Sequence, residues 1–198
     1  MLRYLRFVHA DFVFSMLTLL RPSRIPFRHY LQRSAVAVIY RYRNEACEIL
    51  FIRRAMREGD PWSGHMAFPG GVIQSEDSSA SDAAIRETLE EIGIDLYKCS
   101  RFSKRLGDLL TRRHHKLLPM VVSPFMFLLM QDVEFTLNDE VDEVVWIPLD
   151  YFKDESNKQH FYWQAGRIKL RMSCYDYEGR RIWGLTYMML QEIINKKF

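Results

Sequence analysis

The chain has 198 residues, 48% of them hydrophobic and 27% charged, which is typical of a single soluble globular domain. A net charge of +3 at pH 7 argues against a general nucleic-acid binder, although local basic loops could hold an anionic substrate. The three cysteines, Cys47, Cys99 and Cys174, are far apart and show no C-x-x-C spacing, so we expect neither a disulfide scaffold nor a zinc site and predict a cytoplasmic protein.

Residues 1–34 are predicted to form an N-terminal helix and a linker ahead of one domain at residues 35–198. The uncharged run at 12–20 is shorter than the ~20 apolar residues of a transmembrane helix, so no integral membrane segment is expected. A helix packed on the domain is the first interpretation. A membrane-surface segment and an organellar transit peptide are the alternatives.

Two strands, at residues 34–40 and 48–52, are expected to form a hairpin around Asn44 and Glu45. A charged loop at 53–64 then leads to Phe68, Pro69, Gly70 and Gly71. Because glycine adopts backbone conformations that other residues avoid, we expect this glycine pair to form a turn.

A helix is predicted after the glycine pair. Its start signals are three serines, Ser78, Ser79 and Ser81. Gly93 is the stop signal. At about 100° per residue, one face of this helix is apolar and the opposite face is acidic. The apolar face carries Ile85, Leu89 and Ile92, and the acidic face carries Glu87, Glu90 and Glu91.

The three glutamates have two interpretations. An acidic helix face is usually a solvated surface. However, crowded carboxylates repel one another, and a cation that prefers oxygen ligands, such as Mg²⁺ or Mn²⁺, would reverse that cost. The preceding glycine pair and the adjacent Arg86 favour the metal site.

The rest of the chain predicts mainly strands. We expect a strand at 105–111, a central strand within 117–130 and another at 144–149. A second hairpin is expected from 159–164 and 168–175, and a final helix covers 185–196.

The run from Arg86 to Ile94 resembles the second half of the Nudix box, Arg-Glu-apolar-X-Glu-Glu-X-Gly-apolar, with Thr88 as the one soft departure. In the first half, Asp77 stands where Glu is expected, and eight residues rather than seven separate it from Arg86. This longer loop is similar to the coenzyme A diphosphatase branch. So are the Gly-x3-Phe-Pro-Gly-Gly run at 64–71 and the Ile-Trp-Gly-x-Thr run at 182–186. Asp60 departs from that branch, which tends to carry an arginine there.

The resemblance implies an α/β/α sandwich with a mixed β-sheet and the Nudix loop-helix-loop. It also implies metal-dependent hydrolysis of a diphosphate bond, with coenzyme A or its thioesters as the first candidate substrate. The alternatives are other nucleoside diphosphate derivatives (NADH, ADP-ribose, nucleotide sugars or oxidised nucleotides) and a non-catalytic nucleotide sensor. The implied Mg²⁺ or Mn²⁺ ligands are Glu87, Glu90, Glu91 and the Gly71 carbonyl. A homodimer is one alternative for the oligomeric state.

Further roles are assigned to residues around this box. Arg86 is expected to orient Glu87 and Asp77 through charge-assisted hydrogen bonds. The general base is left open among Glu87, Glu90, Glu140, Glu143, His114 and His115. The predicted substrate contacts are Arg53, Arg54, Arg112, Arg113, Lys116 and Phe68. Trp62 and Tyr40, like Phe68, could stack on a base, although packing is the alternative for all three.

Overall fold

The computed structural model of the chain describes residues 24–59, 62–112, 119–165 and 168–195. Several predictions therefore fall outside the described residues: the helix expected within residues 1–20, Asp60, Arg113, His114, His115 and Lys116. Arg112 is described only as part of a strand. Within the described chain, no helix has the length and apolar character needed to cross a membrane.

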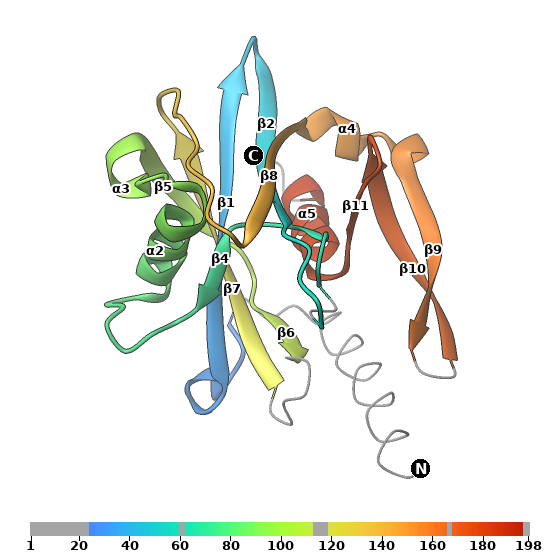
Figure 1. Cartoon of the computed structure of the whole chain (residues 1–198), viewed down its shortest axis with the longest axis horizontal. Coiled ribbons are helices and arrows are strands. Elements are labelled where there is room, and N and C mark those ends of the chain that lie inside the picture. Colours follow the sequence, from blue (N-terminus) through green and yellow to red (C-terminus); the bar gives the residue numbers. More distant parts are fainter. Residues whose placement is uncertain (1–23, 60–61, 113–118, 166–167, 196–198) are drawn as a thin grey trace.

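Most of the described strands form one large mixed sheet (Figure 1). Its main path runs β3-β2-β1-β7-β5, while β4 pairs with β1, β6 with β7 and β8 with β2. The pairing of β1 with β7 is parallel, and the other pairings are antiparallel. The bounds are β1 (Gln32–Arg43), β2 (Ala46–Arg54), β3 (Met66–Ala67), β4 (Gly70–Val72), β5 (Ser100–Arg105), β6 (Leu109–Arg112), β7 (Pro119–Leu129) and β8 (Val141–Pro148).

A second, three-stranded antiparallel sheet lies at the C-terminal end of the chain, in the order β11-β10-β9. Its strands are β9 (Lys158–Ala165), β10 (Ile168–Tyr177) and β11 (Arg180–Trp183). The helices are η2 (Arg28–Tyr30), α2 (Ala80–Ile92), α3 (Leu96–Cys99), α4 (Leu149–Lys153), η3 (Glu155–Asn157) and α5 (Gly184–Asn195).

Helices cover both faces of the large sheet, because the central strands are apolar on both sides. Along β1, Ala37 and Ile39 pack in a core cluster with α2 and α3, whereas Val38 and Tyr40 pack in a cluster with α4 and α5. Figure 1 shows α2 and α3 on one side of the sheet and α5 on the other. The expected α/β/α sandwich with a mixed sheet is confirmed.

The prediction of a single strand at 105–111 is wrong. The segment forms two strands, β5 and β6, which pair with successive parts of β7. Between them, the N–H of Gly107 donates to the Glu192 carboxylate of α5 at 3.0 Å. Asp108 is buried, accepting hydrogen bonds from the Ser123 hydroxyl at 2.6 Å and the Ile25 N–H at 2.9 Å. These side-chain contacts replace the strand pairing at this point and fasten the segment before β1 to the sheet.

The prediction of a turn at the glycine pair is also wrong, because Gly70 and Gly71 belong to the short strand β4 beside β1. Gly70 has a φ of 150°, and a Cβ there would lie 2.3 Å from the Ala35 carbonyl oxygen. Glycine is thus required by the close approach of two strands rather than by chain reversal.

Candidate active site

The helix that carries the glutamates begins and ends as predicted. The Ser79 hydroxyl accepts a hydrogen bond from the Asp82 N–H at 3.2 Å and caps the N-terminus of α2. Gly93 ends the helix in the left-handed conformation, with a φ of 75°, and its N–H donates to the Leu89 carbonyl.

The two faces of α2 differ from the expected pattern. Leu89, predicted to be on the apolar face, is 48% exposed, whereas Glu91, predicted to be on the acidic face, is only 5% exposed. Ile85 and Ile92 of the predicted apolar face are buried, but the buried surface also extends through Ala84, Thr88 and Glu91. This wider buried face includes one carboxylate of the box, which lies beneath β4.

Glu91 is held there by the glycine strand. Its Oε2 accepts a hydrogen bond from the Gly70 N–H at 2.9 Å. The pKa of Glu91 is raised to about 8, and burial is the largest cause. The Gly70 hydrogen bond and the Arg54 charge oppose the shift, and the carboxylates of Glu87 and Glu140 contribute to it. Because Glu91 is buried beside two other carboxylates, its ionised form would be stabilised by a positive charge nearby.

Glu87 lies against the second glycine. A Cβ added to Gly71 would lie 2.4 Å from the Glu87 Cδ, so only glycine leaves room for this carboxyl group. The Gly71 carbonyl accepts a hydrogen bond from the Ser34 hydroxyl at 2.6 Å, which orients it. Burial also raises the pKa of Glu87, with Arg86 acting in the opposite direction.

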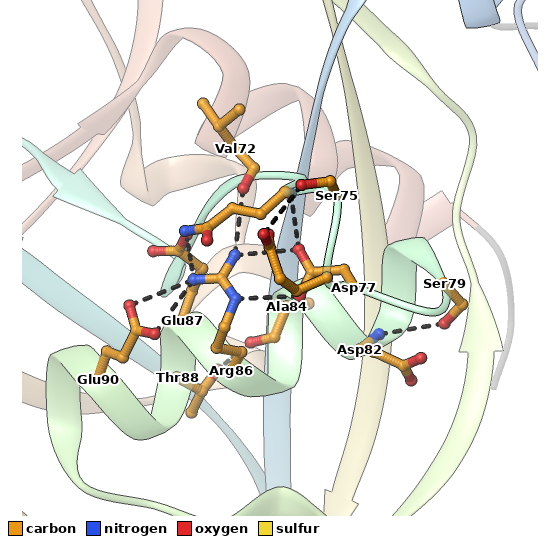
Figure 2. A network of polar contacts seen from close by, with 12 residues as sticks. Val72, Ser75, Asp77, Ser79, Asp82, Ala84, Arg86, Glu87, Thr88 and Glu90 are labelled. Carbon is orange, nitrogen blue, oxygen red and sulfur yellow. Dashed lines mark hydrogen bonds and ion pairs between the residues drawn. The ribbon is translucent and has the colours of Figure 1, made fainter.

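Arg86 is the centre of the polar network in Figure 2. Its guanidinium binds Asp77 through two bonds, Nε to Oδ1 at 3.0 Å and Nη2 to Oδ2 at 3.1 Å. Nη1 donates to Glu87 Oε1 at 2.9 Å and to Glu90 at 3.2 Å, and Nη2 reaches the Val72 carbonyl at 3.2 Å. The paired Arg86 holds the pKa of Asp77 below its usual range. The geometry predicted for Arg86 with Asp77 and Glu87 is present.

The donors on α2 and β4 fit a divalent cation in their chemistry. Glu87, Glu91 and the Gly71 carbonyl supply hard oxygen atoms where β4 meets α2, in a setting that disfavours uncompensated negative charge. Glu90 lies further out, with its side chain 53% exposed and paired with Arg86. Among the described residues, no three His, Cys, Asp or Glu side chains converge as a ready-made metal-binding group.

Two later glutamates occupy different environments. Glu140 is close enough to Glu91 to raise its pKa, and one of its oxygens binds Arg57 Nη1 at 3.3 Å. Glu143 on β8 is bound by Arg180 of β11, with Nε to Oε2 at 3.2 Å, which lowers the pKa of Glu143. Nothing in the sequence pattern signalled the roles of Arg180 or of Ser34, because each acts through a contact across the fold.

The predicted substrate contacts do not form one group. Arg53 and Arg54 end β2, whereas Arg112 ends β6, and β1 and β7 lie between those strands. Arg53 is paired with Glu143 at 3.5 Å, and Arg54 lies near Glu91. Phe68 is 4% exposed and its ring stacks on Phe51 in the core, so we leave it out of the proposed substrate contacts.

Comparison with known proteins identifies the family. The NUDIX domain matches residues 31–165, which is more than half of the chain. The chain therefore belongs to the NUDIX domain family, whose hydrolases generally use divalent metal ions.

Among curated proteins, the chain is 39% identical to an uncharacterised protein of Schizosaccharomyces pombe, over 51% of this chain and 32% of that protein. It is 27% identical to the mitochondrial coenzyme A diphosphatase NUDT8 of Mus musculus, over 72% of this chain and 67% of the relative. It is 29% identical to the peroxisomal coenzyme A diphosphatase ndx-8 of Caenorhabditis elegans, over 50% of this chain and 41% of the relative. The chain thus spans about a third to two thirds of these relatives.

Solved structures support the fold. The structure of a C. elegans Ap4A hydrolase binary complex has a TM-score of 0.52 and 23% identity, covering 61% of this chain and 82% of that one. A MutT/nudix family protein from Enterococcus faecalis has a TM-score of 0.51 and 16% identity, covering 90% of this chain and 66% of that one.

Proposed function

We propose that this chain is a metal-dependent diphosphatase that hydrolyses coenzyme A or its thioesters. The observation that carries the proposal is Glu91, a buried carboxylate fixed to Gly70 beside Glu87 and Glu140. Placing charge in this position is costly without a counter-ion. The coenzyme A assignment is supported by the two curated relatives with that printed activity.

Glu87, Glu91 and the Gly71 carbonyl would hold Mg²⁺ or Mn²⁺, with Glu90 joining them if it leaves Arg86. When bound, the ion would supply the positive charge that neutralises the diphosphate. Arg86 keeps Glu87 in place through its bonds to Asp77 and Val72. Arg54, whose charge reaches Glu91, would contribute to binding the anionic substrate.

We assign the general base to Glu140 rather than Glu143. A base must lie near the reacting water and be able to take up a proton. Glu140 is electrostatically coupled to Glu91 and has a side chain 44% exposed. Glu143 is engaged by both Arg180 and Arg53, and its lowered pKa disfavours protonation. Water is then added across one phosphoanhydride bond, giving phosphopantetheine and 3′,5′-ADP from coenzyme A.

The test is a panel of coenzyme A, NADH and ADP-ribose with Mg²⁺ or Mn²⁺. We expect coenzyme A to be cleaved fastest. Glu91→Gln should lose hydrolysis while remaining folded, whereas Glu76→Gln, at an exposed carboxylate in the loop before α2, should keep it. If coenzyme A is cleaved no faster than the other two, the substrate assignment fails. If Glu91→Gln keeps full turnover, the metal-site assignment fails.

A further inference from the structure

The small sheet packs against α5 through one of its two faces. Tyr175 of β10 and Ile182 of β11 lie on that face and share a core cluster with Leu190 of α5. Figure 1 shows α5 between the large sheet and the small sheet. Because side chains alternate between the faces of a sheet, the neighbouring residues of each strand lie on the opposite face. We call that opposite face the outer face.

The outer face is apolar. Two cross-strand pairs, Trp163 with Leu170 and Phe161 with Met172, lie on it together with Trp183 of β11. The Trp183 ring contacts Phe161 at 5.1 Å and Trp163 at 6.0 Å. All five side chains are half-buried, and in the part of the chain that the structure describes none of them belongs to either core cluster.

Aromatic side chains continue this surface beyond the sheet, and a cation lies on it. The His65 ring contacts Trp183 at 5.2 Å and Trp62 at 5.8 Å, and Trp62 is 41% exposed. The Arg181 guanidinium lies over the Phe161 ring, 4.7 Å from its centroid. An apolar surface of this kind on a folded domain indicates a site of interaction.

The hairpin that carries most of the outer face is strongly basic. Residues 158–175 include Lys158, Arg167, Lys169 and Arg171 and contain no aspartate or glutamate. Lys169 and Arg171 are exposed, and within the described chain neither forms an ion pair. Arg171 pairs across the ladder with Tyr162, which is 71% exposed. The outer end of the hairpin therefore has an apolar face and a basic face.

We propose that the β9–β10 hairpin docks the protein on an anionic lipid bilayer. The outer face would enter the boundary between head groups and acyl chains, as the apolar face of an interfacial amphipathic helix does. Tryptophan and tyrosine favour this depth, because their rings are apolar and their N–H or O–H groups remain hydrated. Lys169, Arg171 and Arg181 would extend to the lipid phosphates while their aliphatic stems stay in contact with the apolar layer.

Charge complementarity favours this partner over two others. A second copy of the chain would bring another basic hairpin close, and like charges oppose that contact. A nucleic acid would supply phosphates and bases but no apolar phase for Leu170 and Met172. An anionic bilayer offers both negative charge and an apolar layer. The α5-covered face would point away from the bilayer, with the large sheet beyond it.

The test measures co-sedimentation of the full chain with vesicles of phosphatidylcholine, with and without phosphatidylserine. We expect binding to the phosphatidylserine vesicles that weakens as salt is added. The double variant Lys169→Gln, Arg171→Gln should bind them about 25-fold more weakly. The matched control is Arg43→Gln with Arg101→Gln, which removes two exposed positive charges from the large sheet and should bind within about threefold of wild type. Leu170→Gln keeps the net charge and should weaken binding about tenfold, with folding checked by circular dichroism.

The proposal fails if wild type does not sediment with phosphatidylserine vesicles. It also fails if the hairpin double variant binds like wild type, because another segment, such as residues 1–20, would then carry the lipid contact. Equal losses in the hairpin and control double variants would show a general charge effect and overturn the assignment to the hairpin. Unchanged binding by Leu170→Gln would refute insertion of the outer face. Binding of a single-stranded oligonucleotide that displaces the vesicles and is lost in the hairpin double variant would reassign the surface to nucleic acid.

Discussion

Replacing Glu91 by Gln should change how the stability of the metal-free protein depends on pH. The pKa of Glu91 is raised from an ordinary value of 4.5 to about 8, so the folded state retains a proton that the unfolded state has lost. The free energy of unfolding should therefore fall as pH rises from about 4.5 to about 8, and then level off. At 1.36 kcal/mol per pKa unit, the loss is on the order of 4–5 kcal/mol.

Gln keeps a side-chain oxygen that can accept from the Gly70 N–H, but it stays neutral at every pH. Metal-free Glu91→Gln should thus be more stable than wild type by several kcal/mol near pH 9 and similar to it near pH 5. Urea denaturation with a chelator present, followed by tryptophan fluorescence, measures this. Glu90→Gln is the control, because Glu90 is on the same helix and half exposed, so its loss should cost about 1 kcal/mol or less.

If wild type and Glu91→Gln lose stability in parallel between pH 5 and pH 9, the argument from burial is refuted. Adding Mg²⁺ near pH 9 should stabilise wild type, because an ion that binds only the folded state shifts the equilibrium toward it. The same addition should leave Glu91→Gln largely unchanged.

Three further substitutions test other parts of the site and fold. Gly71→Ala should displace the Glu87 carboxyl group and lower kcat/KM about a hundredfold with the fold retained; normal turnover would contradict the close contact. Glu140→Gln should lower kcat by about 10²–10⁴-fold, whereas Glu143→Gln should change kcat by only a few-fold. The reverse ranking would reassign the base. Asp108→Asn should destabilise the protein by about 3–5 kcal/mol in urea denaturation, because the buried Asp108 carboxylate pairs with both Arg28 and Arg105. A loss below about 1 kcal/mol would show that these two ion pairs contribute little.

The sequence predicted the parts of the site that depend on local spacing. Ser79 and Gly93 bound the helix as expected, and Arg86 pairs with Asp77 and Glu87 as the resemblance to the Nudix box implied. The two hairpins are local as well, since few residues separate their paired strands along the chain.

The features of the site that the sequence did not predict depend on tertiary contacts. Helical periodicity placed Leu89 on the apolar face and Glu91 on the acidic face, but it contains no information about the Gly70 N–H that holds Glu91 in a buried position. The same limit applies to Gly70. Glycine is required at this position because the Ala35 carbonyl of another strand leaves no room for a Cβ. Likewise, the separation of Arg112 from Arg53 and Arg54 follows from the strand order, which charge patterning along the chain cannot show.

Product identification with coenzyme A tests the central claim most directly. The full chain is incubated with coenzyme A and Mg²⁺ or Mn²⁺, and the products are separated and identified by mass. We predict phosphopantetheine and 3′,5′-ADP in equal amounts from wild type and from Glu76→Gln, and neither product from Glu91→Gln. Intact coenzyme A after incubation with wild type, or products formed by cleavage at any bond other than the diphosphate, would contradict the account.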